Sequence, residues 1–469
     1  MWRSPADEAT RIVSPEIIAP RLVAPAPVPP ASDLSMLRLI ARLRTNALAA
    51  WPKRAYEVLF LHRRTLGRDS YLVNDPYEAL RILRSEDGIY ERPLGFRRLF
   101  RPIVGGGLML AEGAAWRKQR HRMAPAFNGR HVEKLIPRFR SVGERLLLRL
   151  EGTAQANLSQ LFQDVAIDAI GTAAFSMNLH SLSQRIENFR TNYLRSARAS
   201  LLDHFARKEG AFFLRWGARG RHGRRGRAIV RQIIRDRRTC PDHDLGSPDF
   251  LDLILGIQSG GTALSDEDVC DEVATILGTG FDTPGRVMFW TVYLLSLDPH
   301  AQDRVREELR RFPPHQVREL SDLDHWPFLH KCICEALRLY PPLQAIIRVP
   351  RVAVEISGRA VKAGSYIAVS PWVMHRHAAL WDQPDSFFPD RFAGNLQAAM
   401  RTRGFIPFGM GSRTCIGASF AMTEIALILA MLLDRHRISL GDDRPVLPIS
   451  IVTTVPSREP VFHLRPLAS

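Results

Sequence analysis

Helical spacing of apolar residues dominates the chain from Asp33 onward, and patches with strand-like alternation are few. The clearest helix begins at Ser265, where Asp268 completes a capping box, and it ends before Pro299. Its middle, residues 274–281, is apolar on nearly all sides, which is typical of a buried helix. We therefore predict a long central helix of about 50 Å, enough to cross a whole domain.

Short strands are predicted at two places. One strand covers residues 70–74, after which Pro76 opens a helix at its favoured first position. A second strand covers 352–356, followed by a turn at 357–358 and a return strand over 361–369, which predicts a hairpin. The overall pattern predicts a mainly α fold with a small β-sheet region.

Proline sets the first 32 residues apart from the rest. Six prolines fall between residues 15 and 30, and proline cannot continue a helix. We predict an extended or disordered arm over residues 1–32 and a single domain over 33–469. No linker, repeat or second composition regime interrupts that domain, so no further domain is expected within it.

Composition excludes several protein classes. Apolar residues make up 45% and charged residues 24%, which supports a large core and excludes general disorder. Five cysteines are too few for a disulfide framework and fit a reducing cytoplasm. No stretch approaches the roughly 18 uncharged apolar residues of a membrane span, and no secretory signal pattern is present. We expect a soluble, cytoplasmic protein with at most peripheral membrane contact.

The net charge of +17 leaves nucleic acid, an anionic membrane surface or an acidic protein open as partners. Ten arginines fall between Arg215 and Arg238, without the aromatic interleaving or base-reading motif of a nucleic-acid binder. Ile229, Ile233 and Ile234 have helical spacing, so we interpret this stretch as a solvated helix with one packed face. Attraction to anionic lipid is the second interpretation, and no nucleic-acid partner is expected.

A glycine-rich loop with a single cysteine precedes an apolar helix. Gly409 and Gly411 suit a tight loop that holds backbone amides close to a ligand. Cys415 lies where that helix begins, and the free N–H groups of a helix start stabilise a thiolate. Arg413 can supply a cation to an anionic group nearby. A buried free cysteine would be the ordinary interpretation of Cys415 alone.

The whole loop is more specific than its cysteine, since it matches Phe-x-x-Gly-x-Arg-x-Cys-x-Gly at every defining position. It resembles the haem-binding loop of the cytochrome P-450 family. The resemblance implies the P-450 fold and a haem b cofactor, with the Cys415 thiolate as the axial ligand of the iron. It also implies a cofactor-binding role for the other loop residues: Phe408, Gly409, Gly411, Arg413 and Gly417.

Trp116 and Arg120 lie four residues apart, on one face of a predicted helix whose other side is basic. An ordinary basic amphipathic helix would show the same pattern. The segment resembles helix C of the family, which implies that Trp116 and Arg120 hold a haem propionate, with Gln119 in place of a frequent histidine. The basic face, including Lys118 and Arg122, would then dock a separate electron donor, an acidic ferredoxin or flavodoxin with its reductase.

An acid–alcohol pair, Asp282 and Thr283, interrupts the apolar middle of the central helix. Pro284 lacks the N–H that would bond the carbonyl of Gly280, so we predict a kink there. The segment resembles the oxygen-activation motif of the family, which implies catalytic roles for Gly280, Asp282 and Thr283 in proton delivery. Thr279 and Pro284 depart from the usual motif, and a kink that only packs is the alternative.

Glu335 and Arg338 lie three apart on a predicted helix, among apolar neighbours that indicate burial. They resemble the Glu-x-x-Arg pair of the family, which implies a structural triad with Arg391 of the later Phe-x-Pro-x-Arg-Phe motif. By the same resemblance Arg348 is a further propionate partner. A weaker prediction places Ile346, Ile347 and Thr279 at the substrate pocket.

The resemblance implies a monooxygenase that uses O2 and two electrons from a separate redox partner to hydroxylate or epoxidise an apolar small molecule. A peroxide-driven or isomerase-type member of the same family remains an alternative. So does a haem-thiolate sensor without catalysis, and a nucleic-acid binder that would depend on the arginines alone.

Overall fold

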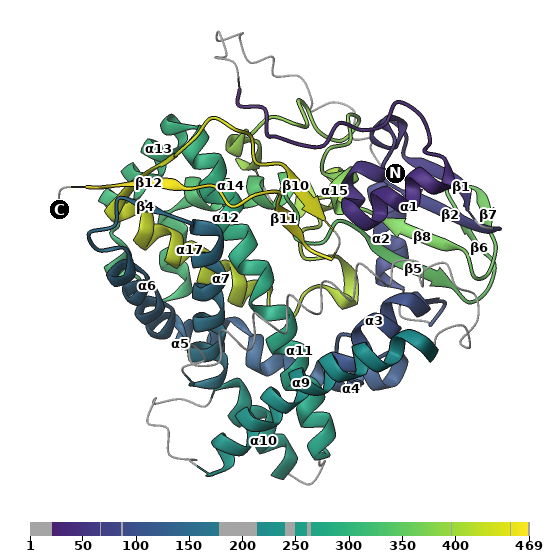
Figure 1. Ribbon diagram of the computed structural model, residues 1–469, viewed down its shortest axis with the longest axis horizontal. Helices are drawn as coiled ribbons and strands as arrows, with labels where there is room; N and C mark the ends of the chain where they lie inside the picture. The colour runs from purple at the N-terminus through teal and green to yellow at the C-terminus, as the bar shows by residue number, and fades with distance from the viewer. Residues whose placement is uncertain are drawn as a thin grey trace, which may run out of the picture.

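The computed structural model describes residues 21–65, 67–85, 88–177, 213–239, 249–259, 264–394, 396–450 and 452–467. The fold is mainly helical with small sheets, as predicted. Figure 1 shows the larger sheet on one side of the molecule and most helices on the other. The helices are α1 (Met36–Thr45), α2 (Pro76–Arg84), α3 (Leu94–Val104), α4 (Gly113–Met123), α5 (Gly129–Lys134), α6 (Ile136–Leu150), α7 (Leu158–Ala169), α9 (Phe213–Thr239), α10 (Phe250–Ser259), α11 (Asp266–Gly280), α12 (Asp282–Leu297), α13 (Pro299–Arg311), α14 (Pro327–Leu339), α15 (Pro371–Met374), α16 (Leu396–Arg403) and α17 (Ala418–Arg435).

The strands are short and come from both ends of the chain. They are β1 (Phe60–Thr65), β2 (Arg68–Val73), β3 (Tyr90–Glu91), β4 (Gln155–Ala156), β5 (Ile346–Pro350), β6 (Val354–Ile356), β7 (Arg359–Val361), β8 (Tyr366–Val369), β9 (His436–Leu440), β10 (Pro448–Ser450), β11 (Thr454–Pro456) and β12 (Phe462–Pro466).

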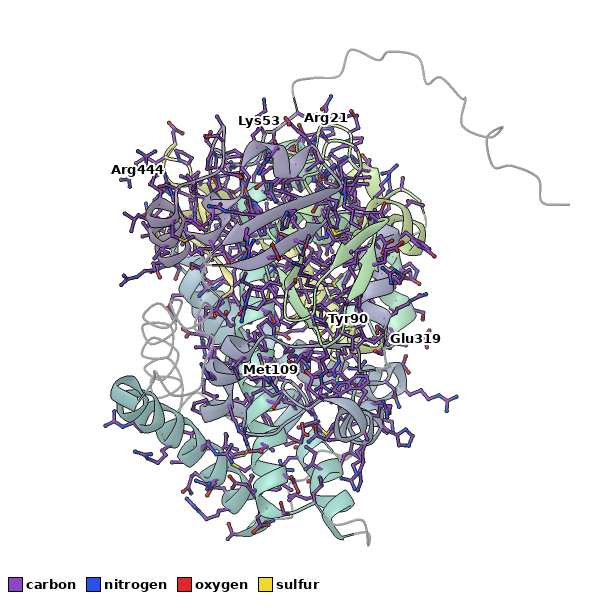
Figure 2. All side chains as sticks on the ribbon, turned by 90° about the vertical axis from the view of Figure 1, so that its right-hand side faces the viewer. Arg21, Lys53, Tyr90, Met109, Glu319 and Arg444 are labelled. Atoms are coloured by element: carbon purple, nitrogen blue, oxygen red, sulfur yellow. The ribbon has the colours of Figure 1, made fainter. Side chains whose placement is uncertain are left out.

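The larger sheet has the order β1-β2-β8-β5-β3. Only β2 and β8 pair in parallel, with Ser70 opposite Tyr366, while β5 and β8 pair antiparallel, with Ile347 opposite Ala368. Figure 2, turned to face this side, shows the sheet in front, with Arg21 and Lys53 near one end and Met109 toward the lower helices. The sheet therefore joins segments that are almost 300 residues apart in the sequence.

The predicted elements around residues 70 and 350 are largely confirmed. The strand near residue 70 is β2, and Pro76 opens α2 with Asp75 as its N-cap. The predicted hairpin exists as β6 and β7, but its return strand ends at Val361 rather than Val369. The chain turns at Gly364, where φ is 77°, and residues 366–369 pair instead with β2 and β5.

The predicted central helix is present, but it is broken into α11 and α12 at Phe281. The capping box of Ser265 and Asp268 forms as predicted. Almost every side chain of α12 is buried, and Trp290 stacks on Tyr340 with ring centroids 4.0 Å apart. Helix α12 packs against α7 and α17, so the two halves of the central helix run through the middle of the molecule (Figure 1).

The arginine-rich stretch forms helix α9, and Ile229, Ile233 and Ile234 are buried, as the spacing predicted. The expectation of a solvated arginine face is wrong for Arg227 and Arg237, which are only 9% and 5% exposed. Carboxylates on neighbouring helices explain their burial, since a buried charge needs a partner. The side chains of Arg215, Arg219 and Arg221 lie outside the described part of the chain.

The predicted arm lies outside the described residues as far as residue 20. Residues 21–35 form no helix, and Ala24, which is buried, donates its N–H to the carbonyl of Asp385 over 2.8 Å. Val23 bridges to Ser386. Among the described residues, no helix has both the length and the apolar character required to cross a membrane.

Candidate functional site

The loop of residues 408–417 takes the tight form that its glycines predicted. Gly409 and Gly411 have φ of 74° and 78°, a region that L side chains rarely adopt. A Cβ at Gly411 would lie 2.7 Å from the carbonyl oxygen of Leu83, so α2 also excludes a side chain there. The Cys415 N–H donates to the carbonyl of Phe408 over 2.9 Å and closes the loop.

Cys415 lies just before α17, close to the predicted helix start. Its side chain is exposed, whereas the other described cysteines, Cys270, Cys332 and Cys334, are buried. Protein nevertheless surrounds the sulfur closely, and loss of hydration raises the pKa of the Cys415 thiol. The Gly417 N–H and the Arg120 guanidinium act on that pKa in the opposite direction. An accessible sulfur enclosed by protein is what an axial ligand of a buried cofactor requires.

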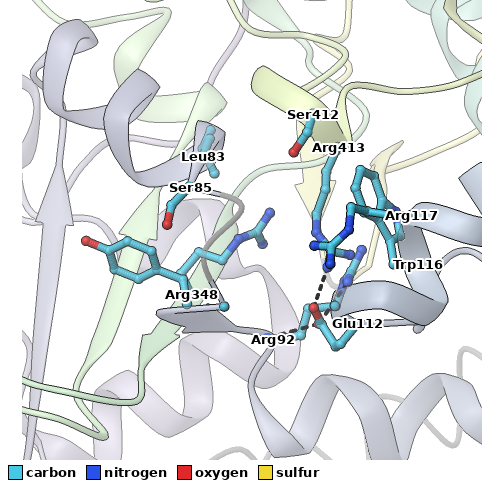
Figure 3. Close-up of a pocket in the computed structure, with 12 residues that line it drawn as sticks. Leu83, Ser85, Arg92, Glu112, Trp116, Arg117, Arg348, Ser412 and Arg413 are labelled. Atoms are coloured by element: carbon cyan, nitrogen blue, oxygen red, sulfur yellow. Dashed lines mark hydrogen bonds and ion pairs between the residues drawn. The ribbon is translucent and has the colours of Figure 1, made fainter.

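A cluster of guanidinium groups lies beside the loop (Figure 3). Arg413 donates to the carbonyl of Ala111 over 3.0 Å and forms an ion pair with Glu112. Its guanidinium also lies over the ring of Trp116, 4.5 Å from the centroid. Arg92 pairs with the same carboxylate, with Nη1 to Oε1 at 2.9 Å. Trp116 and Arg413, predicted independently, therefore meet at one pocket.

Arg348 reaches the same pocket from β5, on the opposite side from α4 (Figure 3). Burial, together with repulsion by Arg92 and Arg413, lowers the pKa of Arg348 to about 10. Burial and Arg92 likewise lower the pKa of Arg413 to about 10, against the effect of Glu112. Two guanidinium groups thus pair with the carboxylate of Glu112, and a third, that of Arg348, lines the same pocket, an arrangement that favours binding of a further anion.

The central helix kinks where proline predicted it. Phe281, at φ −103° and ψ −38°, separates α11 from α12. Gly278 and Thr279 are exposed, although the helix residues before them are buried. The Thr283 hydroxyl donates to the carbonyl of Thr279 over 3.2 Å. One side of this otherwise buried helix is therefore accessible at the kink, where Gly278 and Phe281 line an apolar pocket.

Asp282 has specific partners at that kink. Its Oδ2 accepts a hydrogen bond of 2.6 Å from the hydroxyl of Thr453, and its Oδ1 lies 3.4 Å from Nε of Arg286. Gly280 has a packing reason to be glycine, because a Cβ there would lie 2.1 Å from Cδ1 of Ile170. Thr453 and Arg286 keep the carboxylate of Asp282 in place beside Thr283.

The predicted structural triad is brought together completely. Arg338 donates two hydrogen bonds of 2.7 Å to the carboxylate of Glu335, and both side chains are fully buried. Arg391 donates to the same carboxylate over 3.0 Å. The remaining donors of Arg338 reach backbone carbonyls, including those of His375 and Pro384, so its charge is well satisfied.

An apolar pocket lies between α3, α9 and the central helix. Its lining is entirely apolar apart from backbone: Ile103, Gly226, Ile229, Val230, Ala274, Leu277, Gly278 and Phe281. None of the three predicted pocket residues lines it: Ile346 and Ile347 are half-buried on β5, and Thr279 is exposed beside Gly278. Ile346 instead packs near the cysteine loop, where its Cδ1 lies 3.7 Å from the Cβ position of Gly409.

Several site residues were missed from the sequence: Arg92, Glu112, Arg286 and Thr453. Two of them carried a local signal, since Arg286 follows Asp282 by four residues and Glu112 precedes Trp116 by four. Arg92 and Thr453 carried none, because they come from segments distant in sequence. Arg120, predicted to hold a propionate, does not line the pocket of Arg348 and Arg413. It lies near the sulfur, where its positive charge lowers the pKa of the Cys415 thiol.

These features fit haem b. The accessible Cys415 thiol can bind the iron, and the surplus of guanidinium groups around Glu112 can bind the propionates. Among the described residues, Arg348 forms no ion pair and donates only to the carbonyl of Ile347, over 3.2 Å. A half-buried guanidinium with such a weak partner is suited to an anionic ligand.

Comparison with known proteins agrees with this geometry. The family profile "Cytochrome P450" matches residues 64–461. Human cytochrome P450 4F2 is 30% identical over 413 residues, which cover 82% of this chain and 76% of that protein. The taurochenodeoxycholic 6 alpha-hydroxylase of Sus scrofa is 31% identical over 432 residues, 85% of this chain and 82% of the relative. The crystal structure of the cytochrome P450DA heme domain superimposes with a TM-score of 0.77, at 23% identity, over 96% of this chain and 99% of that chain.

The chain therefore belongs to the cytochrome P450 family and is a haem b monooxygenase with a cysteine thiolate ligand.

Proposed function

We propose that this enzyme hydroxylates or epoxidises an apolar small molecule, using O2 and two electrons from a separate redox partner. The observation that carries the proposal is the kink at Phe281, which places Asp282 and Thr283 next to an exposed stretch of an otherwise buried helix. Haem b, when bound, supplies the iron chemistry that activates oxygen. The side chains position the cofactor, hold the substrate and move protons.

Cofactor binding is assigned to residues from three parts of the chain. Cys415 would bind the iron, and the glycines of its loop let the backbone approach closely. Arg348 and Arg413, with Trp116 packed on Arg413, would hold the propionates. Arg120 acts on the sulfur by its charge. Substitution of Cys415 by serine should abolish the thiolate signature of the reduced carbonyl complex.

Proton delivery is assigned to Asp282 and Thr283. The Thr283 hydroxyl donates to the Thr279 carbonyl, and its oxygen can still accept a hydrogen bond from a donor on the accessible side of the helix. Asp282 is held by Thr453 and Arg286, so its carboxylate can exchange protons without a large movement. The roles of Gly280 and Thr279 would be to shape this open stretch of the helix.

The substrate is proposed to be apolar because the pocket beside the kink is apolar. Gly278 and Phe281 belong both to the kinked segment and to this pocket, which extends to Ile229 and Val230 of α9. The Sus scrofa relative is named as a taurochenodeoxycholic 6 alpha-hydroxylase. Hydroxylation of an apolar small molecule agrees with that name and with the apolar pocket of this chain.

The electron donor is proposed to dock on the outer face of α4. Arg117, Lys118 and His121 are exposed there, while Trp116 on the same helix is buried against the cofactor loop. An acidic ferredoxin or flavodoxin has the complementary charge. Lys118→Glu should slow reduction by an acidic ferredoxin, and Lys53→Glu, also exposed, is the matched control. Equal reduction rates in the two variants would reject this docking face.

The decisive experiment compares turnover of the haem-loaded enzyme in two systems. A ferredoxin system with O2 should give product at a higher rate than hydrogen peroxide alone. Turnover with peroxide only would favour the peroxide-driven alternative. The non-catalytic sensor is favoured if the wild type shows no turnover in either system and Thr283→Ala leaves the function of the protein in the cell intact. A Soret-band screen of apolar compounds identifies the substrate class.

The domain boundaries and location stay predictions. The single domain is proposed to span residues 33–469, with the proline-rich segment 1–32 as its arm. A cytoplasmic location with at most peripheral membrane contact is tested by cell fractionation, with and without high salt. Retention in the membrane fraction after the salt wash would contradict it.

A further inference from the structure

Glu112 occupies an unusual place for a glutamate. It is the N-cap residue of α4, a position where serine, threonine, aspartate and asparagine are preferred, and its side chain makes no capping hydrogen bond. Gly113, which follows at φ 56°, adopts a backbone conformation that favours glycine. The carboxylate of Glu112 is thus directed away from its own helix and toward the pocket of Figure 3.

Two arginines from distant segments converge on this carboxylate. Arg92, which follows β3, places Nη1 2.9 Å from Oε1 of Glu112, and Arg413 of the cysteine loop pairs with Oε2. Both arginines also donate to the carbonyl of Ala111, over 3.3 and 3.0 Å. Consecutive residues, Ala111 and Glu112, therefore hold both guanidinium groups at the same time.

The contacts are well protected from water. The side chains of Arg92, Glu112 and Arg413 are 14%, 22% and 16% exposed. Ion pairs shielded to this extent are screened less by salt than pairs on the surface, and removal of one partner leaves a poorly solvated charge. The pairs with Glu112 are therefore expected to determine where the two guanidinium groups lie.

The charges around the pocket also depend on Glu112. Arg92, Arg348 and Arg413 carry three positive charges against one carboxylate, and Arg117 lies at the exposed rim. The net charge of the inner group is +2, the complement of two propionates. Mutual repulsion acts on Arg348 and Arg413, and Glu112 is the carboxylate that opposes it for both.

We propose that Glu112 is a positioning residue of the cofactor site, which holds Arg92 and Arg413 together as a clamp and supplies a fixed negative charge beside the propionates. The proposal rests on the proposed cofactor roles of Arg348 and Arg413. Since protein contacts alone hold the two guanidinium groups, Glu112 and the carbonyl of Ala111 lower the entropic cost of ordering two long side chains at binding. The fixed charge stabilises the ferric over the ferrous state of the bound cofactor.

The test uses the full-length holoenzyme with Glu112→Gln, which keeps the size of the side chain and removes its charge. Transfer of haem to apomyoglobin should be about tenfold faster, the factor expected for one lost charge-assisted hydrogen bond. The midpoint potential of the haem should shift to a more positive value. Glu307→Gln is the matched control, because it removes an equal charge from an exposed pair with Arg311 on α13.

Glu112→Asp distinguishes the effect of the charge from the effect of side-chain length. It also provides a second test if Glu112→Gln folds poorly. It keeps the charge but shortens the side chain, so the midpoint potential should stay near that of the wild type while haem transfer is faster. Equal transfer rates and potentials in Glu112→Gln and Glu307→Gln would overturn the proposal. Faster transfer with an unchanged potential in Glu112→Gln would overturn its electrostatic part.

Failure of this inference is distinguishable from failure of the proposed function. If the wild-type protein shows no thiolate-ligated carbonyl spectrum, the assignment of Cys415 as the iron ligand is wrong, whatever the result with the Glu112 variants. If the wild type shows that spectrum and the Glu112 variants behave like the control, only the role of Glu112 is wrong.

Discussion

The hydroxyl of Thr453 donates to Oδ2 of Asp282 over 2.6 Å, across 171 positions of the sequence. Thr453 lies between β10 and β11, and Asp282 is the first residue of α12 after the kink. The short two-stranded sheet near the C-terminus therefore reaches the acid that we assign to proton delivery. The Arg286 guanidinium lies on the other side of the same carboxylate, 3.4 Å away.

Thr453→Val should impair the coupling of oxygen use to product formation. The substitution keeps the shape of the side chain but removes the donor to Asp282, and a hydrogen bond to a charged group is worth about 1.5–3 kcal/mol. We expect product formed per O2 consumed to fall by about tenfold. Thr453→Ser keeps the hydroxyl and should remain near the wild type. Equal coupling in the two variants would mean that the Thr453 hydroxyl has no part in proton delivery.

Glu335→Gln should destabilise the whole fold. Its carboxylate accepts from both Arg338 and Arg391, and loss of one partner of a buried ion pair costs about 3–5 kcal/mol. Urea unfolding followed by far-UV circular dichroism measures this loss, and the Soret band should disappear in the same transition. Arg311→Gln, which breaks an exposed pair, should cost less than about 1 kcal/mol. A similar small cost for both would show that the triad does not stabilise the fold.

Glu272 should make stability depend on pH. Burial raises the pKa of Glu272 from 4.5 to about 7, and Asp271 and Asp268 add to the effect. Between pH 4.5 and 7 the unfolded chain loses this proton while the folded protein keeps it, so stability falls as pH rises through that window. The loss is at most about 3 kcal/mol. Glu272→Gln should remove this slope and raise Tm at pH 8.

The measurement is Tm at a series of pH values from 5 to 8, for the wild type, Glu272→Gln and Glu307→Gln. The exposed Glu307 should behave as the wild type. Parallel curves for the wild type and Glu272→Gln would show that Glu272 is ionised in both states.

Arg227→Gln should loosen the apolar pocket. Arg227 of α9 donates to Oδ1 of Asp271 over 2.5 Å, and the same Asp271 accepts the Gly106 N–H over 2.6 Å. Asp271 thus ties both α9 and the loop after α3 to the central helix, and Gly226 beside Arg227 lines the pocket. Stopped-flow measurement of the Soret shift should show about tenfold faster dissociation of an apolar ligand, as expected for one lost bond between charged groups.

Arg231→Gln is the control for that experiment. Arg231 lies one turn along α9 and pairs with Glu267, but both side chains are about half exposed, so its loss should change the dissociation rate little. If Arg227→Gln and Arg231→Gln release the ligand equally fast, the buried pair has no special role in closing the pocket.

The helix starts and the cysteine loop could be predicted because their determinants are local. Pro76 with Asp75, and Ser265 with Asp268, satisfy backbone N–H groups within one turn. Pro284 breaks the central helix by lacking a donor, whatever surrounds it. The tight form of the cofactor loop was predictable for the same reason, since the backbone torsions of such a loop require glycine at positions 409 and 411.

Distant contacts could not be predicted in this way. The strand over 366–369 was assigned to the hairpin of its neighbours, but it pairs with β2 and β5. Alternation shows that a segment is a strand, but it does not show which edge the strand joins. Likewise the burial of Arg227 and Arg237 depends on two carboxylates that their own sequence context does not contain, Asp271 of α11 and Asp249 just before α10.

The sequence by itself therefore determined the helical architecture, the kink and the loop that presents Cys415, because hydrogen bonds and torsions within a few residues decide these features. Only the tertiary structure decided that Glu112 joins Arg92 to Arg413, and that Thr453 holds Asp282. These charges and hydroxyls meet because helices and strands pack around a common core. Such packing depends on the whole chain rather than on any short segment of it.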